Sequence, residues 1–238
     1  MKDWKYRIGL LVPSINIVAE PTFHQYAPPN ITIHTCRMPR DDMKSTIETH
    51  LNMLKHIENV AKLVAHCKPD VLIMADTTAS FLLGKGSDLD IAQKMREATG
   101  IKSTTASTAV LEALNALNVK RISIITPYPA YTNKKEKIFF EDNGFQIDVL
   151  ASMEIAYSLN MGLVHPSDIC QFTLDNYNST SEAIFISCTN FRGTEIINNL
   201  ENDTELPVVT SNQACLWSAL KTIGIKTDIG LGKLFQVF

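Results

Sequence analysis

The sequence predicts an α/β protein that is divided into two similar lobes, each built around a parallel sheet. Short β-branched runs alternate with longer amphipathic stretches, which is the pattern of strand and helix units around parallel sheets. Several of the strand runs are apolar throughout, as strands covered by helices on both faces must be. The second half of the chain also repeats landmarks of the first half, which favours two lobes over one.

The strands and one long helix can be placed by pattern. The expected strands are residues 7–12, 31–37, 70–75, 121–126, 146–151, 183–187 and 207–210. The clearest helical pattern runs from Ser45 to about His66, because its apolar residues recur at spacings of three and four. Ser45 is the expected N-cap of this helix, which should lie along a sheet.

The internal repeat brings together the residues that follow equivalent strands. Pro13 and Pro127 each end an apolar strand, and Asp76 and Cys188 each open a polar turn at a similar distance behind them. Ser/Thr-rich helix entries follow at residues 103–109 and 210–214. Ligands of open α/β sheets bind beyond the carboxyl ends of the strands, so these turns should surround one cleft between the lobes.

The expected domain organisation follows the repeat. Residues 1–117 together with residues 212–238 form the N-terminal lobe, and residues 118–211 form the C-terminal lobe. With 238 residues, the chain is long enough for either one large domain or two small lobes.

Composition excludes several function classes. The formal net charge is only -3 and no basic stripe is present, so a nucleic-acid surface is not expected. The stretch of lysines near residues 134–137 is mixed with Glu136 and Glu141, which indicates a solvated helix face. Neither a signal peptide nor an apolar run of about 20 residues is seen, so the expected location is the cytoplasm, with no membrane contact.

No metal site is expected. The five cysteines are scattered without the CxxC spacing, which argues against a disulfide framework and against zinc. The six histidines likewise lack a metal-ligand spacing.

Cys188 is the sharpest candidate for chemistry. It lies between a buried strand and a turn whose free N–H groups can stabilise a thiolate, although a packed, inert thiol is the alternative. Hydroxyl, amide and guanidinium donors gather at the same turn, in Ser187, Thr189, Asn190 and Arg192. Arg192 either binds a carboxylate or pairs with a structural acid.

Asp76 is the corresponding residue of the first lobe. It either caps the following helix or serves as a second acid/base, which would require a pKa raised toward neutrality. Thr77 and Thr78 beside it offer hydroxyl and N–H donors for a carboxylate or an enediolate.

Two further side chains follow the first strand of each lobe. Asn16 either caps a helix or presents its amide to a substrate carboxylate. Tyr128 is either a buried structural residue or a hydroxyl donor that reaches into the cleft.

Together these motifs resemble the aspartate/glutamate racemase superfamily, in the group of maleate cis-trans isomerase, arylmalonate decarboxylase and the ectoine-utilisation proteins. The resemblance covers nearly the whole chain. It rests on the segments at residues 9–16, 126–128, 187–192 and 206–217.

The resemblance implies two Rossmann-like lobes related by pseudo-twofold symmetry, with the active site between them and no cofactor. Cys188 falls at the second catalytic cysteine of the family. Asp76 stands where racemases and maleate isomerase have a thiol and where arylmalonate decarboxylase has a glycine. The family binds the substrate carboxylate at positions that correspond to Asn16, Thr77, Thr78 and Tyr128, and the donors Thr189 and Asn190 complete the expected substrate-binding set.

The expected function is a cofactor-independent isomerase or racemase. Cys188 and Asp76 would act as acid and base at the carbon next to a carboxylate of a small carboxylic or dicarboxylic acid. The alternatives are a decarboxylase-like lyase and a small-acid binding protein without catalysis. Asp76 is open to three roles: a base, a ligand for a substrate cation, or a helix cap. The resemblance also favours a homo-oligomer.

Overall fold

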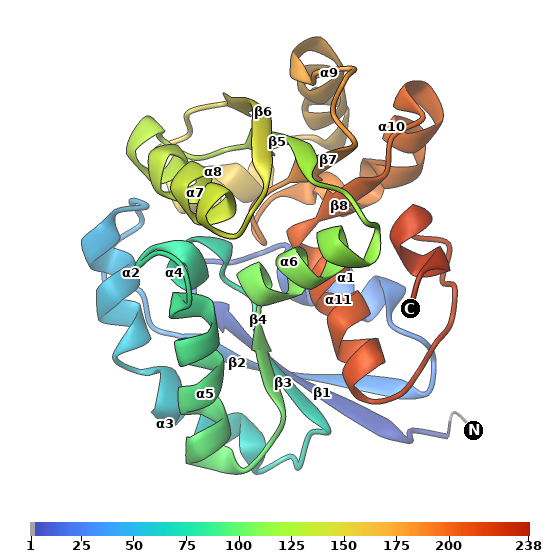
Figure 1. Cartoon of the computed structure of the whole chain (residues 1–238). Coiled ribbons are helices and arrows are strands. Elements are labelled where there is room, and N and C mark those ends of the chain that lie inside the picture. The colour runs from blue at the N-terminus through green and yellow to red at the C-terminus, as the bar shows by residue number, and fades with distance from the viewer. Residues whose placement is uncertain (1–2) are drawn as a thin grey trace.

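The structure, a computed structural model, describes residues 3–238, so residues 1 and 2 of the expected N-terminal lobe lie outside the described residues. Two four-stranded sheets form the centres of two lobes, one below the other in Figure 1. The first sheet has the order β2-β1-β3-β4 and the second has the equivalent order β6-β5-β7-β8. All neighbouring strands are parallel, which confirms the predicted fold class.

The strands of the N-terminal lobe are β1 (Tyr6–Pro13), β2 (Ile31–Met38), β3 (Val71–Met74) and β4 (Ser103–Thr105). Those of the C-terminal lobe are β5 (Arg121–Thr126), β6 (Gln146–Ser152), β7 (Ala183–Ile186) and β8 (Val208–Thr210). The central strands β3 and β7 are buried along their whole length, in agreement with their uninterrupted apolar sequences.

Helices cover both sheets (Figure 1). The first lobe contains α1 (Ala19–Tyr26), α2 (Ile47–Leu54), α3 (Ile57–Ala65), α4 (Thr77–Phe81), α5 (Ser87–Thr99) and α6 (Ala106–Ala116). The second contains α7 (Ala130–Asp142), α8 (Ser158–Leu163), α9 (Pro166–Asn176), the 3-10 helix η1 (Arg192–Ile196) and α10 (Ile197–Thr204). After β8 the chain forms α11 (Ser211–Thr222), which packs against α6, and ends with the 3-10 helix η2 (Lys233–Gln236).

Two expected elements differ in the structure. The predicted helix over 45–66 is two helices, because the chain tightens at Lys55 and His56, whose N–H groups bond three residues back to Asn52 and Met53. Its N-cap is Thr46, which forms a capping box with Thr49, and not Ser45.

The segment from residue 103, expected to be only a helix entry, first forms the strand β4. Thr105 ends this strand, and its side chain accepts the N–H of Thr108 and so caps α6. The short strand was missed because it consists of serine and threonine, which are also typical helix N-cap residues.

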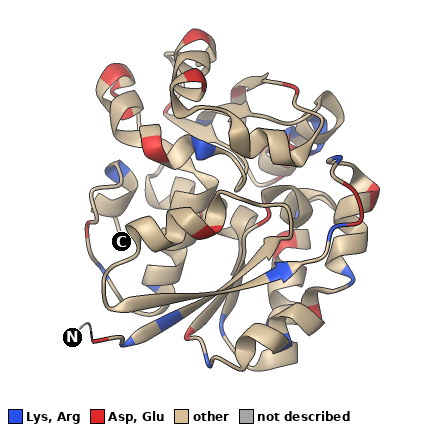
Figure 2. Ribbon diagram, turned by 180° about the vertical axis from the view of Figure 1, so that it is seen from behind, with Lys and Arg blue, Asp and Glu red and all other residues tan. Residues whose placement is uncertain are grey.

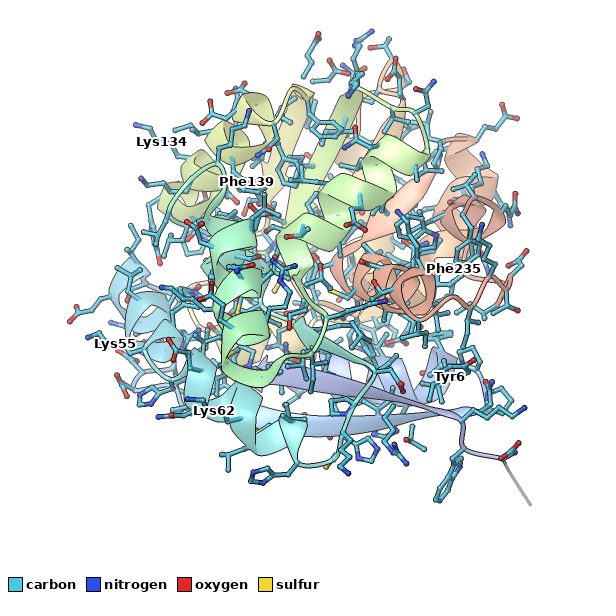
Figure 3. The ribbon with its side chains drawn as sticks, turned by 60° about the horizontal axis from the view of Figure 1, so that its bottom comes forward. Tyr6, Lys55, Lys62, Lys134, Phe139 and Phe235 are labelled. Atoms are coloured by element: carbon cyan, nitrogen blue, oxygen red, sulfur yellow. The ribbon has the colours of Figure 1, made fainter. Side chains whose placement is uncertain are left out.

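The apolar core is continuous across the two lobes. Phe81 of α4 packs edge-on against Tyr128, with ring centroids 6.3 Å apart, and also contacts Phe139 of α7. Figure 3 shows Phe139 inside the upper lobe, whereas Lys55 and Lys134 project outward. Because aromatic side chains bury large areas, this contact fixes the lobes against each other.

The charged side chains of the described residues are dispersed. Figure 2 shows lysines and arginines on both lobes, interspersed with acidic residues. No helix within residues 3–238 is long and apolar enough to cross a membrane.

Hydrogen bonds join the turn after β7 to the first lobe. The Thr189 hydroxyl donates to the carbonyl of Ala75 at 2.8 Å and accepts the Asn16 amide at 3.2 Å. Asn190 accepts the N–H of Ile17 at 2.9 Å. These buried contacts hold the carboxyl ends of the two sheets face to face.

Thr189→Val tests this junction. Valine has the same shape but leaves the Ala75 carbonyl and the Asn16 amide without their partner, which costs about 1–3 kcal/mol per buried group. We expect the free energy of unfolding, measured by urea titration, to fall by roughly that amount. An unchanged stability would show that the junction does not hold the lobes together.

Candidate active site

The carboxyl ends of the two sheets enclose a cavity of about 30 Å³. It is lined by all the predicted site residues: Asn16, Asp76, Thr77, Thr78, Tyr128, Cys188, Thr189 and Asn190. They follow β1, β3, β5 and β7, the strands that the internal repeat pairs. The structure thus brings these residues together, and the role of each stays a prediction.

Cys188 lies directly beyond the buried end of β7. Its φ of +94° is outside the regions that side-chain-bearing residues prefer, at a cost of roughly 1–3 kcal/mol. The Cys188 N–H donates to the Ser211 hydroxyl at 3.1 Å, and the sulfur accepts the N–H of Asn190 at 3.3 Å. The strained turn therefore fixes the thiol at the cavity wall.

The Cys188 thiol is neutral at neutral pH. Burial raises its pKa to about 12, and the charges of Asp76 and Glu136 act in the same direction. The Tyr128 hydroxyl and the Asn190 N–H lower the pKa but do not offset burial. The Asn190 N–H thus lowers the thiol pKa as expected of this turn, but desolvation outweighs it.

Asp76 caps α4 and faces a histidine. One carboxylate oxygen accepts the N–H of Ala79 at 3.0 Å, and the other lies 3.4 Å from Nδ1 of His50. Burial by itself would raise the Asp76 pKa, but His50, Arg40 and the Ala79 N–H together hold it below its ordinary value. The raised pKa that an isolated general base requires is therefore not found, because these neighbours outweigh burial.

Several cavity residues were missed in the sequence, three of them on one segment. Arg40, Ser45 and His50 line the same cavity, on the segment that follows β2. The rule that ligands lie beyond strand ends applies to β2 as it does to β1, and it could have found them. They were overlooked because a single long helix was expected to start at Ser45 and to serve only the sheet.

Most of the predicted binding side chains already have partners. Thr189, Asn190 and Asn16 make the bonds between the lobes, and the Thr77 hydroxyl donates to Ser211 at 3.0 Å. The Tyr128 hydroxyl faces Thr78 and Cys188, and burial raises its pKa well above the ordinary value, so it is a neutral donor.

Arg192 does not reach the cavity, since it pairs with Glu195 at 2.7 Å. The structural-acid alternative for this residue is thus the one observed. Within residues 3–238, no group of three or more His, Cys, Asp or Glu side chains is arranged to hold a metal ion.

Glu136 is a buried acid behind the thiol. It was expected on a solvated face of α7, but its side chain is fully buried and accepts the Ser187 hydroxyl. Burial raises its pKa to about 8. The lysines around Glu136 are exposed, as expected. The sequence pattern of α7 did not show that Glu136, unlike these lysines, points inward.

The arrangement can move protons from two sides. A neutral thiol and a neutral phenol, Cys188 and Tyr128, lie on the C-terminal lobe. The ionised carboxylate of Asp76 lies on the N-terminal lobe beside the His50 imidazole. A carbon acid bound between them would meet a proton donor on one face and a basic group on the other.

Comparison with known proteins gives a family match over nearly the whole chain. The family model described as arylmalonate decarboxylase matches residues 8–235. The arylmalonate decarboxylase of Bordetella bronchiseptica is 30% identical over 170 residues, which cover 70% of this chain and 71% of that protein.

The chain is also similar to maleate isomerases. That of Nocardia farcinica is 23% identical over 241 residues, which cover 97% of this chain and 95% of the relative. A solved structure of a mutant of the Nocardia farcinica maleate cis-trans isomerase, with a covalently bound succinylcysteine intermediate, superposes with a TM-score of 0.91. It is 22% identical and covers 97% of this chain and 98% of the other, which shows the shared fold.

Glu136→Gln tests the buried acid. Because the folded state keeps the proton up to about pH 8 and the unfolded state loses it near pH 4.5, the free energy of unfolding should fall as pH rises through this window. Glutamine cannot ionise, so the variant should lack this fall and gain up to about 4 kcal/mol over the native protein by about pH 9. Urea titrations at about pH 5 and about pH 9 measure the difference. Two parallel pH curves would contradict the burial of a titrating Glu136.

Proposed function

This chain belongs to the arylmalonate decarboxylase family, and from that membership we propose that it is an isomerase or racemase acting next to a carboxylate of a small carboxylic acid. Its relatives include an arylmalonate decarboxylase and maleate isomerases, so the chain is an enzyme of this group. The observation that carries the isomerase proposal is that the neutral thiol of Cys188 faces the ionised carboxylate of Asp76, and the imidazole beside it, across one cavity.

In the proposed reaction the two walls exchange protons with opposite faces of one carbon. The wall that contains Asp76 removes the proton next to the carboxylate, and Cys188 delivers one from the other lobe. The negative charge that develops on the carboxylate is stabilised by neutral donors, namely the Tyr128 hydroxyl and the hydroxyl and N–H groups of Thr77 and Thr78. A thiol of high pKa suits this step, because it keeps its proton until a strongly basic carbanion forms beside it.

The cavity favours a small, anionic substrate. Its volume is about 30 Å³, and polar side chains form much of its lining. Arg40 lines the cavity, and its buried Nε has no hydrogen-bond partner among the described residues. A second carboxylate of a maleate-like or succinate-like acid fits this cation.

The maleate isomerases support cysteine chemistry in general, since one of them was captured with a succinylcysteine intermediate. Addition of sulfur to an alkene needs an attacking thiolate. The raised pKa of Cys188 therefore favours proton transfer over addition for this chain.

Decarboxylation is the second candidate. It is supported by the description of the family model and by Cys188 being the one thiol that lines the cavity of the described residues. In that reaction the bond to the leaving carboxylate breaks to release CO₂, and Cys188 protonates the remaining carbanion. The ionised Asp76 disfavours it, since it would repel a departing carboxylate.

Proton NMR in D₂O with a panel of maleate, succinate, aspartate, 2-hydroxy acids and substituted malonates tests the function. We expect deuterium at the carbon next to a carboxylate, or inversion of configuration there, without loss of CO₂. Cys188→Ala should lower the rate by roughly 10²–10⁴-fold, the usual contribution of an acid or base. Cys67→Ala, which changes an exposed thiol, is the matched control and should react like the native protein.

Release of CO₂ from a malonate would replace the isomerase proposal by the decarboxylase. No turnover of any compound, combined with saturable binding of one of them, would indicate a small-acid binding protein.

A further inference from the structure

We propose that His50 is a second catalytic residue, which transfers the proton on the face of the substrate opposite Cys188, and that Asp76 positions it. This inference rests on the isomerase function proposed above. The group that removes the substrate proton is then the His50 imidazole, which the sequence did not single out. Asp76 acts on the reaction by positioning that imidazole.

The backbone holds His50 at the cavity by contacts from both lobes. The segment before α2 pairs with the segment before α8 through the bridge between Lys44 and Tyr157. The Ser45 N–H donates to the carbonyl of Ala156 at 3.2 Å, next to this bridge. Thr46 then starts α2, and His50 follows in the first turns of the helix. Closure of the lobes therefore places the imidazole.

Three side chains form a connected polar chain at the cavity wall. Nε2 of His50 lies 3.1 Å from the Ser45 hydroxyl, and Nδ1 lies 3.4 Å from Oδ2 of Asp76. The residues are only 3% exposed for Ser45, 4% for His50 and 5% for Asp76, so water competes little for these groups.

The pairing also sets the tautomer of the imidazole. Nδ1 of His50 and Oδ2 of Asp76 have no other hydrogen-bond partner within the described part of the chain, and the two atoms lie 3.4 Å apart. A carboxylate only accepts, so Nδ1 carries the hydrogen and Nε2 has the lone pair. Nε2 is the atom on the side of Ser45, which also lines the cavity.

Asp76 is held in place by a contact of its own. Its second oxygen is fixed by the N–H of Ala79 at the start of α4. The carboxylate thus orients the ring and stabilises the imidazolium that forms when Nε2 takes a proton, as second partners of catalytic histidines do. The other charged or titratable groups that face this pair are Arg40 and Cys188.

The proton balance closes over one turnover. The C–H bond next to the substrate carboxylate breaks and its electron pair remains as the enediolate. Nε2 of His50 takes the proton in place of the Ser45 hydroxyl, which turns away from the Nε2 lone pair that it donates to before substrate binds. The Cys188 thiol then gives its proton to the opposite face of the carbon. The resulting imidazolium and thiolate catalyse the reverse direction, or they return to the neutral pair by exchange with solvent.

His50→Gln tests the assignment with the substrate that the NMR panel identifies. We expect kcat to fall by roughly 10²–10⁴-fold with a small change in KM and an unchanged melting temperature. His56→Ala is the matched control, since this exposed histidine begins α3 outside the cavity, and it should retain the native rate. Asp76→Asn, whose amide oxygen keeps the cap of α4, should lower kcat by a similar factor and shift the pH profile.

Chemical rescue separates catalysis from structure. The rate of His50→Ala should rise with added imidazole but not with pyrazole, which has the same ring size and is a far weaker base. Equal rescue by both would mean that the ring only fills space, and that outcome would overturn the inference.

A His50→Gln variant with a rate within about threefold of the native rate would also overturn the role of His50. The proposed function would still stand in that case, provided that the native protein turns over the substrate. A native protein without turnover of any panel compound would overturn both.

Discussion

The hydrogen bonds around Thr189 are the contacts on which the site depends. They link the turn after β7 to the Ala75 carbonyl after β3 and to the Asn16 amide after β1. Parallel sheets present their carboxyl ends at one edge, and these bonds set two such edges against each other. The cavity, the burial of Cys188 and the approach of α2 to the cleft all follow from that closure.

Burial then decides the charge of each acid near the cleft. The thiol of Cys188 and the carboxyl of Glu136 lie among groups that offer too little compensation, so their pKa values rise and they keep their protons. Asp76 is equally buried, but His50 and Arg40 hold it ionised. The same buried environment thus leaves Cys188 a neutral proton donor on one lobe and Asp76 an ionised group, next to His50, on the other. Such a difference in pKa separates the acid of a site from its base.

The sequence predicted the fold and the first set of cavity residues for physical reasons. Apolar strands that stop at Pro13 and Pro127 are strong signals, and the polar turns after them must lie at the sheet edge. Helix patterns were weaker signals, since the break at Lys55 and the inward direction of Glu136 depend on tertiary packing. The role of His50 could not be predicted either, because its partner Asp76 lies on another element of the same lobe and the two side chains meet only through the packing of α2 against α4. The proposed division into 1–117 with 212–238 and 118–211 stays a prediction.

In the proposed site Cys188 is a neutral thiol opposite the ionised carboxylate of Asp76. Thiolate absorbs in the ultraviolet, so a pH titration of the native protein, minus that of Cys188→Ala, reports this one side chain. The account predicts no thiolate signal from Cys188 between about pH 6 and pH 9, in contrast to an ordinary cysteine, which ionises near pH 8.5. A full thiolate signal near neutral pH would contradict it.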